Sequence, residues 1–315
     1  MDTKERRFFA GGIVALFALV ALLGTLAALG CGGGGDNGGG FVTPPLSGKG
    51  LAFSPYVDSN GCPRNFGSTV DDTCLKTLLN VVNSHTEWVR TYGSTSGLQN
   101  IPRLAKFLNL KVAAGAYVVA NADTEIQNLM NNVNIGLVDL AIVGNEAMQA
   151  GVPRATLIQY INNAKNLRDA AHANVPVTTC LKGDDVYIPD NAPVLAACDV
   201  ICDNMYPNFG DPVTTALTNL KNYYTGMAAS NQVGGKQLII GETGWPSGGT
   251  GTNSQNFTND NERDFHNDIV PWATSKGILA FYFESFDEPA KGEAGGEAYF
   301  GVWNNNLVLK QGLTP

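Results

Sequence analysis

Basic residues are scarce in this chain of 315 residues. Its 20 lysines and arginines are outnumbered by 28 aspartates and glutamates, which gives a net charge of −8 at pH 7. Proteins that bind nucleic acid present clusters of basic residues to the phosphate backbone, and from residue 41 onward this chain has no such cluster. We therefore expect no nucleic-acid partner. The acidic balance also favours a neutral ligand over an anionic one, because an anion usually needs a cationic site.

Patterns that bind metals are also missing. The six cysteines form no C-x-x-C pair, and the three histidines lie in helix-like stretches far from them. Because these spacings do not indicate a zinc site, we interpret His85, His172 and His266 as ordinary helix-surface or core residues. We expect neither a metal nor any other cofactor.

The first 31 residues differ in composition from the rest of the chain. A basic start at residues 4–7 is followed by an uncharged run over residues 8–30, which is the layout of a secretory signal. Residues 28–31 (ALGC) are similar to a bacterial lipoprotein processing site, in which Cys31 would carry the lipid. We therefore expect an exported lipoprotein held in the bacterial cell envelope, at the outer membrane or facing the periplasm. An uncleaved transmembrane anchor is the alternative, because a spanning helix needs about 20 residues.

Residues 32–47 are expected to form a flexible linker, since they begin with a glycine-rich tract. The tract is not a phosphate-binding loop, because no strand precedes it and no Lys-Ser or Lys-Thr follows it. Residues 48–315 then have the composition and length of one large α/β domain.

An exported chain can hold disulfides. If Cys31 carries lipid, five cysteines remain, and Cys62 with Cys74 would close a short loop, so we expect them to form a bridge. Spacing does not decide how the other three cysteines pair, and at least one of them is left over. These three are Cys180, Cys198 and Cys202.

Eight short apolar runs alternate with helical patterns after residue 48. Most runs are continuous, as is typical of parallel strands covered on both faces. Eight strands with helices between them, in roughly 250 residues, predict a (β/α)8 TIM barrel. A doubly wound sheet fits less well, because the glycines at 48–50 come before the first strand. The runs cover residues 50–56, 87–93, 111–118, 138–146, 175–181, 199–207, 236–244 and 278–285.

The end of the domain is expected to be irregular. Pro271 should kink or end the helix predicted around residues 265–272, because proline lacks the N–H that a helix interior uses. The chain stops soon after the eighth strand, so the last helix is expected to be absent or replaced by the loop through Tyr299–Trp303.

Carboxylates, amides and aromatics collect where the predicted strands end, which in such barrels is the rim that carries the active site. Glu146 follows the fourth strand and Glu242 ends the seventh. Two carboxylates on one rim are the minimum set for cleaving a glycosidic bond, and flat aromatic faces suit the C–H face of a sugar. One such residue alone would more often be structural, and we interpret Glu293 and Glu297 in that way. Polar and aromatic residues recur at the same end of several predicted strands, and this recurrence favours an active site over separate structural roles.

Residues 241–247 (GETGWPS) resemble the signature of glycoside hydrolase family 17, the β-1,3-glucanases and related glucanosyltransferases. The resemblance covers most of the chain after the linker, and the fold of that family is a (β/α)8 barrel. Further matching stretches are residues 50–56, VRTYG at 89–93, VGNE at 143–146, NMYP at 204–207, FDE at 286–288 with Lys291, and FGVW at 300–303.

The resemblance implies a role for each glutamate. Glu242 would be the nucleophile and Glu146 the acid/base of a retaining enzyme, with their carboxyl groups about 5–5.5 Å apart. Arg90 and the Tyr206 hydroxyl would hold Glu242 charged and oriented, and the negative charge of Glu242 would raise the pKa of Glu146. Asn145 would bind the sugar 2-hydroxyl.

The implied substrate is a β-1,3-glucan of the laminarin type, cleaved from within or from an end. A glucanosyltransferase is the alternative activity. A non-catalytic glucan-binding lipoprotein is less favoured, because both glutamates are present. A third hypothesis is a membrane-anchored assembly factor, in which residues 8–30 would span the membrane. The side chains expected to contact the sugar chain are Tyr56, Tyr92, Trp245 and Phe286 as flat platforms, and Asn204, Glu284, Glu288 and Lys291 as polar partners.

Overall fold

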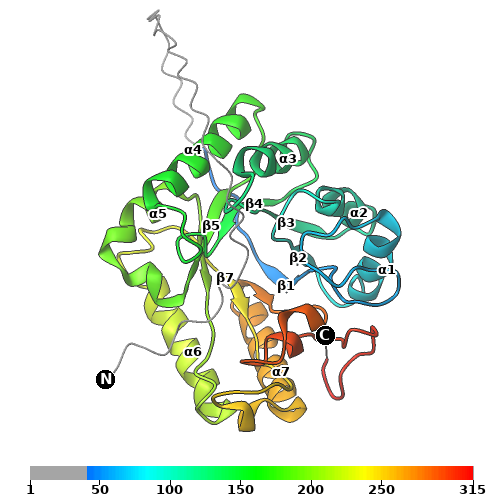
Figure 1. Ribbon diagram of the computed structural model, residues 1–315. Coiled ribbons are helices and arrows are strands. Elements are labelled where there is room, and N and C mark those ends of the chain that lie inside the picture. Colours follow the sequence, from blue (N-terminus) through cyan, green and yellow to red (C-terminus); the bar gives the residue numbers. More distant parts are fainter. Residues whose placement is uncertain (1–40, 315) are drawn as a thin grey trace, which may run out of the picture. The chain divides into compact units, whose positions relative to one another are not determined.

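The computed structural model describes residues 41–314, in which eight parallel strands close into a barrel (Figure 1). Each strand pairs with its neighbours in sequence, and β8 returns to pair with β1. The predicted (β/α)8 TIM barrel is therefore confirmed, and each of the eight predicted runs overlaps one strand. The strands are β1 (Gly48–Ala52), β2 (Trp88–Arg90), β3 (Lys111–Ala116), β4 (Leu140–Asn145), β5 (Val177–Lys182), β6 (Ile201–Asn204), β7 (Leu238–Thr243) and β8 (Leu279–Tyr282).

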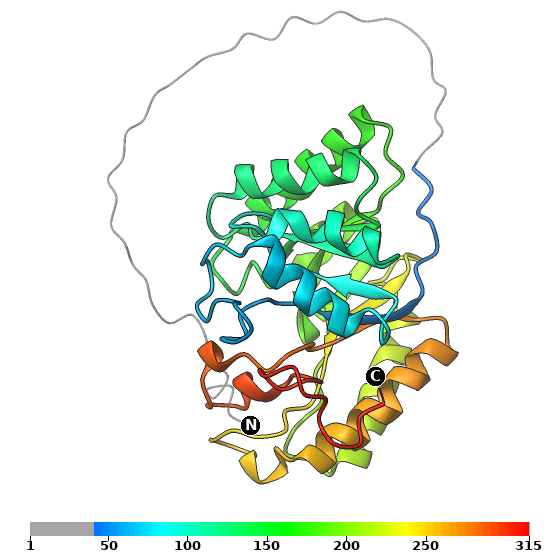
Figure 2. The same cartoon turned by 90° about the vertical axis from the view of Figure 1, so that its right-hand side faces the viewer.

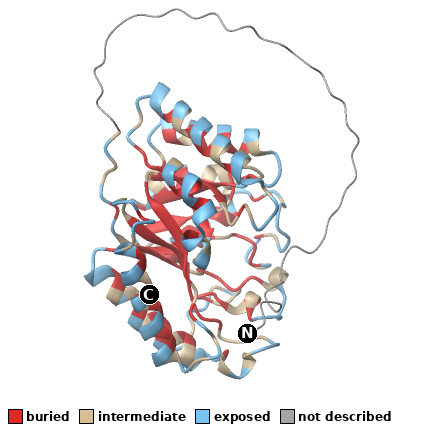
Figure 3. Cartoon of the chain, turned by 90° about the vertical axis from the view of Figure 1, so that its left-hand side faces the viewer, coloured by how far each residue is buried: buried red, intermediate tan, exposed pale blue. Residues whose placement is uncertain are grey.

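Helices connect the strands and cover the outside of the barrel. In α1 the buried side chains include Leu75, Leu78 and Val82, which share one face, and Asp71 caps the helix by accepting a hydrogen bond from Cys74 N at 2.8 Å. Figure 3 shows buried segments on the strands and the inner sides of the helices. The helices are α1 (Asp72–Val82), α2 (Ile101–Phe107), α3 (Ala122–Asn134), α4 (Arg154–Ala170), α5 (Ala192–Ala197), α6 (Val213–Ala228) and α7 (Asn259–Ser275).

The strands are apolar on both faces because both faces are covered. Trp88, Ile142 and Phe281 belong to the cluster that fills the inside of the barrel. Val89 and Val143, one residue along from the first two, belong to the separate cluster between the strands and the helices. This arrangement explains why the runs in the sequence are continuous rather than alternating.

The end of the domain differs partly from expectation. Helix α7 does not end at Pro271 but continues to Ser275. Ile269 and Ala273 are buried on either side of the proline, so packing continues across the missing hydrogen bond.

After β8 the described chain forms short 3-10 turns in place of an eighth α-helix, as expected. The C-terminal segment then runs beside α7 (Figure 2), where Asn267 Nδ2 donates to the Gly312 carbonyl at 2.8 Å.

The cysteine pairing is resolved from residue 41 onward. Cys62 is bonded to Cys74, as predicted, and Cys180 on β5 is bonded to Cys202 on β6. Cys198 is buried and carries a free thiol. Among the described residues there is also no group of histidine, cysteine or carboxylate side chains that could hold a metal ion.

The N-terminal predictions lie outside the described residues. This applies to the signal-like segment 1–31 with Cys31 and to the linker as far as residue 40. The compact unit begins at Thr43, a few residues before β1. From residue 41 to 314, no helix is long and apolar enough to cross a membrane.

The cysteine pairing leads to a first prediction. Alkylation of the denatured, unreduced protein, followed by peptide mass mapping, should modify Cys198 and no other cysteine between residues 41 and 314. Burial raises the pKa of the Cys198 thiol, so the native protein should react slowly at that residue. A reduced sample, in which every cysteine is alkylated, is the control. Alkylated Cys180 or Cys202 in the unreduced sample would contradict the pairing.

Candidate active site

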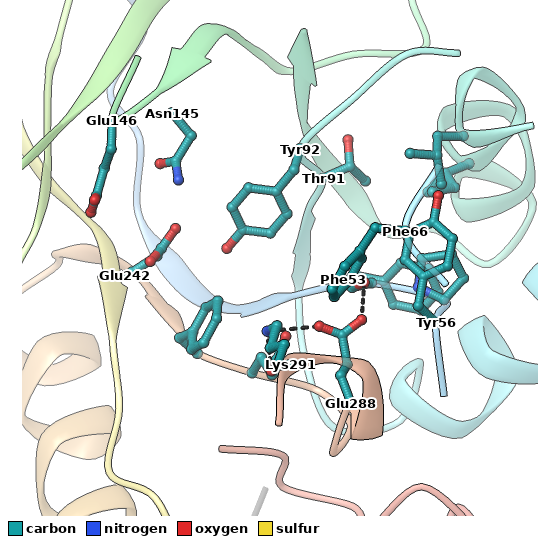
Figure 4. Close-up of a pocket in the computed structure, with 16 residues that line it drawn as sticks. Phe53, Tyr56, Phe66, Thr91, Tyr92, Asn145, Glu146, Glu242, Glu288 and Lys291 are labelled. Atoms are coloured by element: carbon teal, nitrogen blue, oxygen red, sulfur yellow. Dashed lines mark hydrogen bonds and ion pairs between the residues drawn. The ribbon is translucent and has the colours of Figure 1, made fainter. Parts of the chain in front are cut away.

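Two glutamates that are far apart in sequence lie in one cleft of the barrel. Glu146 directly follows β4, Glu242 is the penultimate residue of β7, and both line a cavity of about 280 Å³. Figure 4 shows their side chains next to each other at one end of that cavity. Because both lie at the carboxyl ends of barrel strands, closure of the barrel is what brings them together.

Glu242 is held by a buried cation and a phenol. Arg90 Nη1, from β2, lies 3.1 Å from Glu242 Oε1, and the Tyr206 hydroxyl donates to Glu242 Oε2 at 2.9 Å. The Arg90 side chain is fully buried, and Glu242 is 5% exposed. The ion pair compensates a negative charge that would otherwise be expensive to bury.

Glu146 has neutral partners instead. Asn204 Nδ2 donates to Glu146 Oε1 at 2.9 Å. Burial, and to a lesser extent the negative charge of Glu242, raise the pKa of Glu146, while the Asn204 hydrogen bond and nearby cations oppose the shift. The shift has the expected direction, but burial contributes more to it than the neighbouring carboxylate. The two carboxyl groups therefore have surroundings that suit opposite protonation states.

Arg90 and Asn204 connect the two glutamates. Arg90 Nη1 is 3.3 Å from Asn204 Oδ1, and Arg90 Nη2 donates to Asn145 Oδ1 at 2.7 Å. Arg90 also donates to the carbonyl of Gly241. A side chain at Gly241 would place a Cβ 2.6 Å from both Asn204 Oδ1 and Cys202 Sγ. The glycine before Glu242 therefore makes room for this network and for the disulfide below it.

A second charged cluster, Glu284, Glu288 and Lys291, follows β8 on the same cleft. Lys291 Nζ lies 2.5 Å from Glu284 Oε1 and 2.7 Å from Glu288 Oε2, and Ser54 donates to Glu288. Burial raises the pKa of Glu284 well above its usual range, and the neighbouring Glu288 adds to the shift. Burial alone would lower the pKa of Lys291, but the two carboxylates raise it. The positive charge of Lys291 opposes the rise in the pKa of Glu284.

The structure corrects two of the predicted sugar platforms. Trp245 is 0% exposed, donates from Nε1 to the Asn256 carbonyl at 2.8 Å, and packs edge-on against Phe209. Phe286 is 1% exposed and packs against Phe53 and Trp303. Both are core residues beside the cleft, so neither presents a face to a ligand.

The remaining predicted site residues divide into two groups. The first group contacts the glutamates but does not line the cavity, and consists of Arg90, Asn204 and Tyr206. Six line the cleft itself, namely Tyr56, Tyr92, Asn145, Glu284, Glu288 and Lys291. The Tyr92 ring also covers Arg90, with its centroid 4.8 Å from the guanidinium carbon.

Several residues of the cleft were missed by sequence reasoning. Phe66 lies in the loop after β1, and no pattern in that loop indicates which way its side chain points. Phe283 belongs to the run of β8, where it looks like any other apolar strand residue. The missed lining residues are Phe53, Ser54, Pro55, Phe66, Thr91, Leu98, Ile101 and Phe283.

Comparison with known proteins gives a consistent result. Residues 50–301 match the BtgE/BtgC glycoside hydrolase domain. The chain is 31% identical to the probable glucan endo-1,3-beta-glucosidase btgC of Aspergillus fumigatus, over 74% of this chain and 38% of that protein. It is 23% identical to a glucan 1,3-beta-glucosidase of Candida albicans, over 80% of this chain and 90% of that protein. The chain thus spans well under half the length of the Aspergillus relative.

A solved structure is also similar over most of the chain. The glycoside hydrolase family 17 beta-1,3-glucanosyltransferase from Rhizomucor miehei superposes with a TM-score of 0.70 at 28% identity. The match covers 84% of this chain and 96% of that chain. An active-site mutant of the Rhizomucor protein, solved in complex with laminaritriose, superposes equally well.

The electrostatic coupling of the two glutamates is testable without any substrate. Replacing Glu242 with glutamine removes a negative charge beside Glu146, so the pKa of Glu146 should fall. Carbon NMR titration of the side-chain carboxyl groups measures this pKa. Glu293→Gln, a change at an exposed carboxylate, is the matched control and should leave the pKa of Glu146 unchanged. An unchanged or higher pKa in Glu242→Gln would contradict the coupling.

Proposed function

Because this chain belongs to the BtgE/BtgC glycoside hydrolase family, we propose that it is a retaining glycosidase acting on β-1,3-glucan. Glu242 is the nucleophile and Glu146 the acid/base. The observation that carries the proposal is the unequal environment of two carboxyl groups in one cleft. Glu242 is paired with Arg90, and the pKa of Glu146 is raised.

In the first step Glu146 gives its proton to the glycosidic oxygen as Glu242 attacks the anomeric carbon. The bond from that carbon to the oxygen breaks, an ester to Glu242 forms, and the leaving sugar departs with the proton. The ester carries no charge, so Glu242 no longer raises the pKa of Glu146. Glu146 can then act as a base and remove a proton from a water molecule. The oxygen of that water attacks the anomeric carbon, the ester bond breaks, and Glu242 is released as a carboxylate.

Asn145 is placed to support the reacting sugar. Its Oδ1 accepts hydrogen bonds from Arg90 Nη2 at 2.7 Å and from Asn204 Nδ2 at 3.0 Å. With the oxygen used in this way, the amide NH2 is the group left to face the cleft, where it can donate to the 2-hydroxyl. That contact strengthens as charge develops on the ring in the transition state.

Tyr206 and Tyr92 remain protonated donors throughout. Burial raises the pKa of both phenols well above the usual range, and the negative charge of Glu242 adds to both shifts. Tyr206 can therefore keep its hydrogen bond to Glu242 over the whole working pH range. On the β8 wall, Glu284, Glu288 and Lys291 supply donors and acceptors for hydroxyl groups of the sugar.

The choice of β-1,3-glucan is supported by the relatives. The Aspergillus protein is named a probable glucan endo-1,3-beta-glucosidase and the Candida protein a glucan 1,3-beta-glucosidase. A mutant of the Rhizomucor enzyme was solved with laminaritriose. Transfer to a second glucan is the alternative to hydrolysis, since the Rhizomucor protein is a glucanosyltransferase. Both reactions use the same glutamates and differ only in whether water or a sugar hydroxyl attacks the ester.

The proposed mechanism predicts distinct losses for the two glutamates. Glu242→Gln should abolish turnover of linear β-1,3-oligosaccharides. Glu146→Ala should lower kcat by about 10²–10⁴-fold, the usual contribution of a general acid, and much less on an aryl glycoside whose leaving group needs no proton. Product analysis by NMR should show the β-anomer first. Products longer than the substrate indicate transfer.

Glu293→Gln is the matched control and should behave like the wild type. Turnover that survives in Glu242→Gln would contradict the assignment of the nucleophile, and an α-anomer as first product would contradict retention. Oligosaccharides with β-1,4 or mixed linkages should be cleaved more slowly than β-1,3-oligosaccharides, and equal rates would contradict the proposed linkage.

We also propose that Cys31 is lipidated and holds the exported chain at a bacterial cell envelope. The support is the basic start, the uncharged run and the ALGC sequence at residues 28–31. Cells grown with a radioactive fatty acid should label the wild-type protein and not Cys31→Ala. A label that persists in Cys31→Ala, or label absent from both, would contradict lipidation at this cysteine.

A further inference from the structure

Phe66 is an apolar side chain left half exposed inside the cleft. It lies in the loop between β1 and α1, is 51% exposed, and lines the same cavity as Glu146 and Glu242. Leaving a phenylalanine half exposed forgoes part of the hydrophobic free energy that full burial would contribute. Among the residues that line this cavity, Phe66 alone is exposed, so a ligand in the cleft can cover its ring.

The loop holds Phe66 in place before any ligand binds. The Cys62–Cys74 disulfide ties the loop to the first turn of α1. On the inner side the Tyr56 ring packs edge-on against Phe66, with centroids 5.1 Å apart and planes at 76°. Tyr56 itself is fastened to the loop, because its hydroxyl accepts a hydrogen bond from Gly67 N at 3.3 Å. A ring that is already fixed loses little conformational entropy when a ligand packs on it.

The loop is also attached to the neighbouring wall of the cleft, which follows β8, the strand paired with β1. Arg64 pairs with Asp58 at 2.8 Å within the loop, and its Nη2 donates to the Pro289 carbonyl at 3.2 Å. Pro289 directly follows Glu288 of the β8 wall. The loop therefore extends from β1 to the segment after β8 and borders the far end of the cleft, away from the glutamates.

The order of side chains along the cleft indicates which part of a sugar chain reaches this end. Figure 4 shows Glu146 first, then Glu242, then Tyr92, and last Tyr56 with Phe66. The acid must touch the leaving group and the nucleophile must touch the sugar that stays. The cleft continues from the side of Glu242, so it accommodates the part of the chain that becomes bound to the enzyme.

The chemistry of the far end suits a sugar ring packed face-on. Figure 4 places Tyr56 and Phe66 at this end, with Glu288 of the β8 wall beside them. The apolar side chains of Pro55, Leu98 and Ile101 also line the cavity. Aromatic faces bind the C–H face of a β-linked glucose ring without needing a charge.

We propose that Phe66 is an aromatic platform for a glucosyl unit on the retained side of the substrate, remote from the bond that is cleaved. Affinity for the chain then depends on its length, because only an oligosaccharide that spans from Glu242 past Tyr92 reaches the ring. This inference rests on the proposed function, since it takes the ligand to be a β-1,3-glucan.

The test separates binding from catalysis. In a Glu242→Gln background, calorimetry measures the Kd of linear β-1,3-oligosaccharides of two to six glucose units, with and without Phe66→Ala. We expect Kd for the hexasaccharide to rise about 3–10-fold, the contribution of one aromatic contact, and to change less for the disaccharide. Phe66→Trp should restore the affinity. Phe107→Ala is the matched control, because Phe107 is 77% exposed on α2 and away from the cleft.

Each outcome has a separate meaning. A change in Kd that is equal for all lengths, or no larger than in Phe107→Ala, overturns the platform. Turnover of the same oligosaccharides by the wild type tests the proposed function independently. If Phe66→Ala weakens binding in a length-dependent way but the wild type shows no turnover, the platform is supported and the proposed enzymatic function is contradicted. If the wild type turns the oligosaccharides over but Phe66→Ala has no effect on Kd, the function is supported and the platform is contradicted. An absence of both binding and turnover overturns both.

Discussion

The cleft is organised around one buried cation, Arg90. Its guanidinium contacts Glu242 and the Gly241 carbonyl on β7, Asn204 on β6 and Asn145 on β4. Arginine presents several donors in a fixed plane, so one side chain can hold acceptors from several strands in fixed positions. The charge can be buried because the Glu242 carboxylate lies 3.1 Å away. Arg90 of β2 thereby holds the carboxyl ends of β4, β6 and β7 in fixed positions around its guanidinium group.

This arrangement makes the two glutamates chemically different. The cation is bonded directly to Glu242, whereas Glu146 receives a hydrogen bond from the neutral Asn204. Burial raises the pKa of Glu146, and the negative charge of Glu242 adds to the shift. A glycosidase of the retaining type needs one bare carboxylate and one protonated carboxyl group, and the single position of Arg90 supplies that difference. Gly241 lies next to Asn204 and to the Cys180–Cys202 disulfide. Its lack of a side chain leaves room for both.

The fold and the glutamate pair could be predicted, but of the four expected aromatic platforms only Tyr56 and Tyr92 line the cleft. Tyr92 lies in the cleft, while Trp245 and Phe286 are buried beside it. Side chains alternate along a strand, yet the register shifts between Asp203 and Asn204 on β6 and between Ile240 and Thr243 on β7. Such irregularities break the count of inward and outward positions at the strand ends, where the site residues lie. Phe66 was missed for a related reason, because a loop has no periodicity from which a direction can be inferred.

The sequence by itself determined the number and order of the strands and the placing of Glu146 and Glu242 at their ends. These follow from local apolar runs and from the rule that parallel strands of a barrel end at one rim. It also indicated the Cys62–Cys74 bridge, whose partners are close in the chain. Only the tertiary structure decided that Cys180 pairs with Cys202, that Arg90 also contacts Asn145 and Asn204, and which aromatic rings face the cleft. Those facts depend on distances between segments that meet only when the barrel closes, and no local pattern encodes such distances.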